Sequence, residues 1–218
     1  MRALAHQVDT ESSRLWLHRG APLAMTRAHR HDDVEFNLVL SGSLTYTFWG
    51  EPLSVEGGEL AVFWGAAPHL LHPDATPGAT EGVWVHIPLA TVLGWGLPAD
   101  QLARLLQPAP VVLPIRAISS GAAATMAGWV GDVDHGVDLT TVLLEAQALL
   151  RRALRFATQR LEVSESDPPV PASLVRTTQP AKASAMARYI TENFRDAVTT
   201  ADVAASVHLS SGHASTLF

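Results

Sequence analysis

The chain of 218 residues contains 47% apolar and 17% charged residues, a balance that supports a globular core and argues against disorder. It contains no cysteine, which excludes disulfides, thiolate metal ligands and cysteine nucleophiles and fits a reducing compartment. No segment approaches the roughly 18 consecutive apolar residues of a membrane span, and the N-terminal residues lack the apolar core of a signal peptide. We therefore expect a cytoplasmic protein that is not embedded in a membrane.

The net charge of −6 argues against nucleic-acid binding by the chain as a whole. The charge is unevenly distributed, because residues 182–218 carry three basic and three acidic side chains and residues 1–181 carry 12 basic and 18 acidic ones. The larger N-terminal part is therefore not expected to bind a polyanion. Any case for DNA must rest on the residue pattern of the neutral C-terminal part.

Short runs of β-branched and aromatic residues, separated by turn residues, extend from about residue 28 to residue 87. The expected strands include residues 34–40, 44–49, 60–64 and 83–87. Ser41 and Gly42 predict a tight hairpin between the first two strands, because glycine tolerates positive φ. Short strands at close spacing are typical of a β-sandwich or barrel rather than of alternating βαβ units.

The segment AHRHDDVEFNLVLSG, residues 28–42, carries the strongest functional signal. In an extended chain, side chains alternate between two faces, so positions 29, 31, 35 and 37 share one face. Another histidine follows at position 69, after enough residues for short strands to fold back. Three imidazoles and a carboxylate can bind a divalent cation, and such ligands suit Zn, Ni, Mn, Fe or Cu without choosing among them. The predicted metal ligands are His29, His31, Glu35 and His69.

A second interpretation of the same four groups involves no metal: they hydrogen-bond to one another or line a polar ligand pocket. The neighbouring Asp32 and Asp33 are interpreted as solvated loop or edge residues. His72 is a weaker alternative to His69, and His86 is interpreted as a strand histidine with satisfied hydrogen bonds.

Asn37, Trp64 and Trp84 are candidate ligand-binding residues. Indole rings stack on sugar rings and an amide can fix hydroxyl groups, which suits a carbohydrate effector. Each tryptophan can equally be part of the core. The sequence indicates no catalytic residue and no organic cofactor.

Beyond Pro88 the pattern becomes helical. Helices are expected over residues 99–107, 122–130 and 139–161, with one more strand over 111–115. In the longest helix, apolar residues recur every three or four positions, which predicts one buried face. This face either packs on the β-domain or forms the interface of a homodimer, and periodicity alone does not separate the two.

Residues 162–180 contain four prolines among serines and acids, which predicts a linker. A helical pattern resumes at Ala181. Thr199 and Asp202 are typical of a capped helix start, and after a short break Ser210 can cap a second helix. Such a pair is typical of a helix-turn-helix, whose second helix reaches the major groove of DNA. The candidate DNA-binding residues are Ser210, Ser211, Gly212, His213, Ser215 and Thr216.

Two motifs together resemble known families. The HxHxxxExxxxxxG run and the later Pro68-His69 resemble the two motifs of cupin barrels. The segment RYITENFRDAVTTADVAASVHLSSGHASTLF resembles the first helix-turn-helix of the AraC/XylS family of transcription regulators. Within that family the chain is most similar to regulators of the melibiose-operon type, and the resemblance covers nearly its whole length.

The resemblance implies a mainly β cupin barrel (a double-stranded β-helix) with C-terminal helices over residues 1–161, which senses an effector and dimerises through the 139–161 helix. A linker over 162–180 and a first helix-turn-helix over 181–218 would follow. The family's DNA-binding domain has two such units joined by a long helix. We therefore expect this sequence, which ends at Phe218, to hold part of that domain and to bind operators weakly.

Two functions follow from these motifs. The favoured one is a transcription regulator without enzymatic activity, in which a small molecule, such as a sugar, shifts the population between arrangements of the DNA-binding parts. The alternative is a metal-dependent cupin enzyme, a dioxygenase or isomerase, that uses open metal positions. An enzyme would not need the proline-rich linker and the helix-turn-helix pattern, which is why the regulator is favoured.

Overall fold

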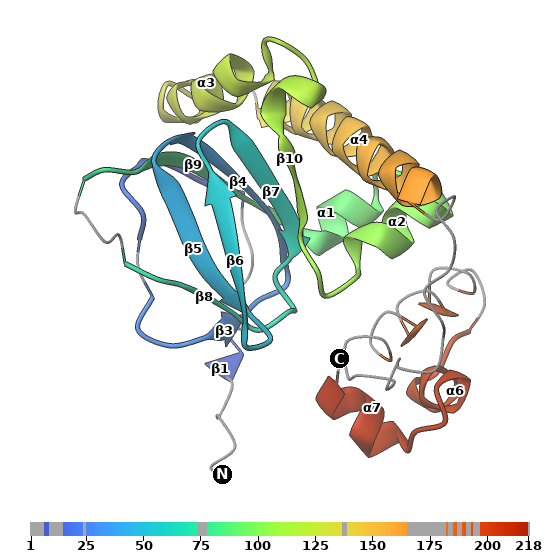
Figure 1. Ribbon diagram of the computed structural model, residues 1–218. Coiled ribbons are helices and arrows are strands. Elements are labelled where there is room, and N and C mark those ends of the chain that lie inside the picture. The colour runs from blue at the N-terminus through green and yellow to red at the C-terminus, as the bar shows by residue number, and fades with distance from the viewer. Residues whose placement is uncertain are drawn as a thin grey trace.

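Two five-stranded sheets face each other in the N-terminal part of the chain (Figure 1). The structure is a computed structural model. It describes residues 7–8, 15–23, 25–73, 78–136, 139–164, 182, 185–186, 189–190, 193 and 197–217. Most of the predicted linker and Phe218 lie outside these residues.

The central sheet has the strand order β10 (Val111–Pro114), β7 (Glu59–Trp64), β4 (Asp33–Ser41), β9 (Glu81–Pro88) and β2 (Trp16–Gly20). The outer sheet has the order β1 (Gln7–Val8), β3 (His29–Arg30), β8 (His69–Leu71), β5 (Ser43–Phe48) and β6 (Glu51–Glu56). Neighbouring strands are antiparallel, apart from the parallel pair β1–β3. The prediction of a mainly β architecture built from short strands is confirmed.

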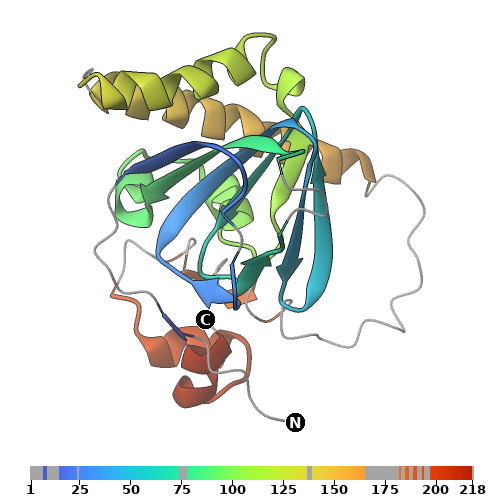
Figure 2. The same ribbon diagram turned by 90° about the vertical axis from the view of Figure 1, so that its left-hand side faces the viewer.

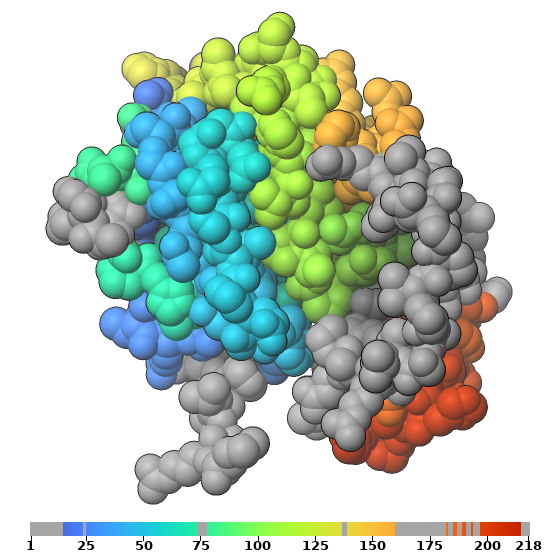
Figure 3. Space-filling model, in the orientation of Figure 1, coloured from blue at the N-terminus to red at the C-terminus, as the bar shows by residue number. Residues whose placement is uncertain are grey.

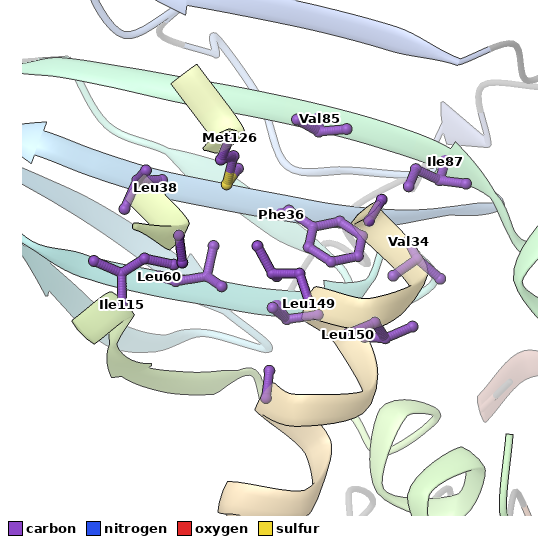
Figure 4. Close-up of a cluster of buried hydrophobic side chains, with 14 of the residues drawn as sticks. Val34, Phe36, Leu38, Leu60, Val85, Ile87, Ile115, Met126, Leu149 and Leu150 are labelled. Carbon is purple, nitrogen blue, oxygen red and sulfur yellow. The ribbon is translucent and has the colours of Figure 1, made fainter. Parts of the chain in front are cut away.

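Helices cover one face of the central sheet (Figures 1 and 2). They are α1 (Leu89–Leu93), α2 (Ala99–Leu105), the 3-10 helix η1 (Ile115–Ala117), α3 (Ala122–Asp134) and α4 (Leu139–Ser164). Alternate residues of β4 point toward them, and Phe36 lies in one cluster with Met126 of α3 and Leu149 of α4 (Figure 4).

The other face of the central sheet packs against the outer sheet. There Val39 and Phe63 form a second buried cluster with Tyr46 and Phe48 of β5. Seven consecutive residues of β4, from position 33 to 39, are therefore buried. In the space-filling view β5 and β6 form part of the surface (Figure 3), and β6 is mostly exposed. The polar side chains of Asp33, Glu35 and Asn37 in β4 are thus enclosed between the two sheets.

The hairpin predicted at Ser41-Gly42 is wrong. β4 pairs with β7 and β9, whereas β5 pairs with β6 and β8, so Gly42, at φ +76°, leads the chain from one sheet to the other. The two-residue hairpin lies instead at Trp49-Gly50, where both residues have positive φ, as a type I′ turn requires.

The apolar stripe of α4 packs on the central sheet. Six of its residues are buried there, namely Val142, Ala146, Leu149, Leu150, Ala153 and Leu154. At the edge of this contact, Arg151 Nη2 donates to the carbonyl oxygen of Trp95 at 2.6 Å. Of the two interpretations of the stripe, packing within the chain is therefore the one observed. The opposite face of the helix carries Leu144, which is 60% exposed.

Helices α6 (Thr200–Ser206) and α7 (Ser211–Leu217) have a small core of their own. Thr199 and Asp202 form a reciprocal capping box at the start of α6, as predicted. Val203, Ala204 and Ala214 are buried in that core. Among the described residues, no helix is both long and apolar enough to cross a membrane.

Leu150→Ala tests the packing of α4. The Leu150 side chain is fully buried against the central sheet. We expect the free energy of unfolding to fall by about 2–5 kcal/mol, because truncation removes apolar burial and leaves a cavity. Urea denaturation followed by circular dichroism measures this loss.

Leu144→Ala is the matched control, since the same truncation is made on the same helix at an exposed position. At a protein concentration at which the chain is monomeric, its expected effect on the free energy of unfolding is within about 0.5 kcal/mol. Equal losses in the two variants would contradict the packing of α4. A loss at Leu144 that depends on protein concentration would place this side chain in an interface between two chains.

Candidate metal and effector site

A cluster of imidazoles and carboxylates lies between the two sheets. His29 of β3 and His69 of β8 are paired neighbours in the outer sheet. Glu35 of β4 and His86 of β9 are paired neighbours in the central sheet. His31 lies in the connection between β3 and β4, so it can contact groups from both sheets.

The four predicted metal ligands lie together. His31 Nε2 is 2.6 Å from Glu35 Oε1, and His69 Nε2 is 3.1 Å from the same oxygen. The His29 ring centroid lies 4.5 Å from that of His69 and 5.4 Å from that of His31. One nitrogen from each of these three histidines can be chosen so that all lie within 4.8 Å of one another.

The four predicted ligands lie close together for a different reason from the one that the sequence suggested. Residues 28–42 do not form one strand, because β3 and β4 belong to different sheets. His29 and Glu35 therefore approach from opposite sides of the space between the sheets. The shared parity of positions 29 and 35 did not determine this arrangement, which depends on the chain crossing from sheet to sheet at His31-Asp32.

The sequence interpretation missed Asp33 and His86. Asp33 is only 8% exposed, which corrects its interpretation as a solvated residue. Its Oδ2 lies 3.4 Å from His31 Nδ1 and 3.7 Å from His86 Nδ1. His86 Nε2 lies 3.5 Å from Glu35 Oε2. The sequence did offer a signal for Asp33, because it lies two residues from Glu35 and so shares its face of β4. It offered none for His86, whose place beside them depends on the register between β4 and β9.

The histidines around the two carboxyl groups lower the pKa of both. Burial alone would raise the pKa of Glu35, but the charges of His86 and His69 and the hydrogen bond from His31 hold it well below its usual range. Burial also acts against the charged form of Asp33, yet its hydrogen bonds with His31 and His86 lower the pKa of that carboxyl. Both groups are therefore carboxylates near neutral pH.

The surroundings shift the pKa of His31 and that of His29 in opposite directions. Burial alone would lower the pKa of His31, but hydrogen bonds to Asp33 and Glu35 outweigh it and raise this pKa to about 9. Burial and the neighbouring His69 and His31 lower the pKa of His29 to about 4. His29 is thus neutral near pH 7, and its imidazole keeps a free lone pair.

His69 is fully buried, and one of its nitrogens faces a carboxylate. Its Nδ1 lies 2.8 Å from the carbonyl oxygen of Ala67, which can only accept, so this contact places a proton on Nδ1. Its Nε2 has no hydrogen-bond partner among the described residues, although Glu35 Oε1 is 3.1 Å away. Once Nε2 has lost its proton, its lone pair and the Glu35 oxygen face each other, an arrangement that fits a bound cation.

Asn37 and Trp84, two candidate ligand-binding residues, are buried behind Glu35. Asn37 Nδ2 donates to Glu35 Oε2 and to Tyr46 Oη, both at 2.9 Å. Trp84 Nε1 lies 3.4 Å from the same Tyr46 oxygen. Asn37 therefore contacts Glu35 directly, whereas Trp84 contacts Tyr46, the second partner of Asn37. The third candidate, Trp64, is partly exposed at the end of β7, and its Nε1 donates to Asp32 Oδ1 at 3.3 Å.

Gly65 holds the position of His31. The His31 N–H donates to the carbonyl oxygen of Gly65, and the Gly65 N–H donates to that of Asp33. A Cβ atom at position 65 would overlap the His31 imidazole. Only glycine leaves room for the ring where it contacts Glu35, and the sequence interpretation did not single this residue out.

The candidate DNA-binding residues lie at the start of α7. Ser210, Ser211, Gly212 and His213 are exposed. Ser210 caps the helix, as predicted, since its Oγ accepts from the His213 N–H at 3.3 Å. The side chains of Ser215 and Thr216 lie outside the described part of the chain.

Known proteins resemble the chain in sequence and, more weakly, in structure. No family model matches it. The melibiose operon regulatory protein of Escherichia coli strain K12 is 24% identical over 212 residues, which span 96% of this chain and 68% of that protein. Another Escherichia coli strain, CFT073, has a protein of the same name with the same identity and coverage.

Two solved structures are similar at lower identity. The AraC-like transcriptional activator CuxR is 15% identical, with a TM-score of 0.42 over 86% of this chain and 60% of that one. Fatty-acid-bound ToxT of Vibrio cholerae is 9% identical, with a TM-score of 0.43 over 93% and 72%. A cupin protein from Bacteroides fragilis matches 34% of this chain and 64% of its own at a TM-score of 0.28. We draw nothing further from scores this low.

The similarity to the melibiose operon regulatory protein extends over 96% of the chain. That relative is named as a regulatory protein, not as an enzyme. The chain is therefore similar in sequence, over nearly its whole length, to a transcription regulator of the kind that its motifs predict.

Proposed function

We propose that the protein is a DNA-binding transcription regulator whose β-domain senses a small molecule. The observation that carries this proposal is the similarity to the melibiose operon regulatory protein over 96% of the chain. In this proposal residues 1–161 form a cupin-type sensor, 162–180 a linker and 181–218 a helix-turn-helix. The metal-dependent cupin enzyme is less favoured, because the curated relatives are regulatory proteins.

We propose that the sensor holds one divalent transition metal through His29, His31, Glu35 and His69. The Nε2 atom of His69, which has no hydrogen-bond partner among the described residues, and the neutral state of His29 support this proposal. Nitrogen and oxygen ligands suit Zn, Ni, Mn, Fe or Cu. The ligands come from both sheets, so a bound cation would join them and could take an oxygen atom of an effector as a further ligand.

A sugar is the effector class that we propose. Melibiose, to which the relatives' name refers, is a disaccharide, and the partly exposed indole of Trp64 offers a stacking surface close to the site. We also propose a homodimer through the exposed face of α4, where Leu144 is uncovered. The exposed polar residues at the start of α7 would contact DNA.

Metal content tests the proposed metal site. We expect about one equivalent of transition metal per chain after purification without chelator, measured by plasma mass spectrometry. The double variant His29→Ala, His31→Ala should lose it, because two of four ligands are gone. His135→Ala, which removes an exposed histidine outside the cluster, should keep it. A parent protein that stays empty after addition of Zn or Ni would refute the metal part of the proposal.

Gly65→Ala tests whether the position of the His31 ring matters for the metal. The added methyl group should displace the ring and weaken metal affinity by about 10- to 100-fold, as changes around metal ligands typically do. Gly128→Ala, where a Cβ meets nothing, is the matched control and should bind like the parent. Calorimetric titration with Zn measures both, and identical affinities would show that His31 is not a ligand.

DNA contact by α7 is tested by selecting duplexes from a random pool at low salt. We expect weak binding that enriches a short sequence motif. His213→Ala should lower affinity for that motif about 5- to 100-fold, since a base contact contributes roughly 1–3 kcal/mol. His135→Ala, the same change on the β-domain side of the chain, should leave it unchanged. Equal affinities of the two variants in fluorescence anisotropy would exclude His213 from the interface.

A further inference from the structure

We infer that His31, Asp33 and His86 form a second cation position, next to the first and sharing His31 with it. This inference goes beyond the proposed metal site, because Asp33 and His86 are not part of the ligand set described above. Its chemistry is that of a divalent transition metal with two imidazole ligands and one carboxylate.

The three groups are already close enough to share a cation. One ligand atom from each lies within 4.8 Å of the others. Asp33 Oδ2 is 3.4 Å from His31 Nδ1 and 3.7 Å from His86 Nδ1. The rings of His31 and His86 stack at a centroid distance of 5.0 Å and an interplanar angle of 16°, so the two imidazoles lie side by side and nearly parallel.

The carboxylate of Asp33 supplies an independent indication of a ligand. The residue is 8% exposed, and its Oδ1 has no hydrogen-bond partner among the described residues. A buried carboxylate oxygen without a partner is costly. The oxygen that faces His31 and His86 is Oδ2, so a cation at this position would also satisfy Oδ1 by binding both oxygens of the carboxylate, whereas the first position leaves Asp33 unused.

Because both positions need His31, only one of them can hold a cation at a time. A cation that binds His31 must displace a proton from its imidazolium, and the neutral imidazole that results has one nitrogen lone pair, because its other nitrogen carries a proton. His31 can therefore serve the first position through Nε2, which faces Glu35, or the second through Nδ1, which faces Asp33. We expect one cation per chain, bound more tightly at the first position, where four protein ligands are available instead of three.

The two positions differ in what they connect. The first takes His29 and His69 from the outer sheet and Glu35 from the central sheet. The second takes its ligands from β4, β9 and the connection before β4, so it involves no strand of the outer sheet. Movement of a cation from the first position to the second would release the link between the sheets.

The test removes the first position and asks whether metal binding persists. In the variant His29→Ala, His69→Ala, we expect about one equivalent of Zn by calorimetric titration, with affinity about 10- to 100-fold below that of the parent. Adding His86→Ala should abolish this binding, and adding His135→Ala instead should not. Circular dichroism confirms that each variant is folded, and His69→Leu replaces His69→Ala if the smaller side chain prevents folding.

A folded His29→Ala, His69→Ala protein that binds no Zn would overturn the second position. Two equivalents in the parent would overturn the exclusive use of His31. The reverse variant, Asp33→Asn with His86→Ala, distinguishes this inference from the proposed metal site. If that variant loses all Zn and the His29, His69 variant keeps it, the proposed first site fails and the second position stands.

Discussion

The contact of Glu35 with the histidines around it is the interaction on which this structure depends. A carboxylate buried between two sheets is tolerated only if positive charge or hydrogen-bond donors compensate its lost hydration, since an uncompensated buried charge costs several kcal/mol. His31 at 2.6 Å and Asn37 at 2.9 Å supply that compensation. A cation would supply it more completely, because it would also satisfy the free nitrogen of His69.

The surroundings hold these groups in place. Asn37 donates to one oxygen of Glu35 and also to Tyr46 Oη, while Gly65 leaves the space that the His31 ring occupies. The helices α3 and α4 cover the face of the central sheet that points away from the outer sheet. Strand β4 is therefore enclosed on both sides. A site so enclosed is suited to sensing, because a change at its ligands acts on two packed sheets at once.

The sequence predicted the strands well because their apolar and β-branched runs are local properties. The observed β4, β5, β7 and β9 each lie within three residues of the predicted bounds, and the apolar stripe of α4 is buried as its spacing indicated. The hairpin at Ser41-Gly42 was wrong for a physical reason. The positive φ of a glycine is a local property, so the sequence could predict a turn there. Whether the chain then turns back into the same sheet or crosses to the other one depends on strands far along the sequence.

The sequence by itself determined the element types, the cap at Thr199, the four candidate ligands and the resemblance to AraC-family regulators, because each rests on residue identity and short-range spacing. Only the tertiary structure brought Asp33 and His86 into the cluster and placed Asn37 and Trp84 behind Glu35. These placements follow from strand register and from the stacking of one sheet on another. Both are fixed by contacts between distant residues, which periodicity along a single sequence does not encode.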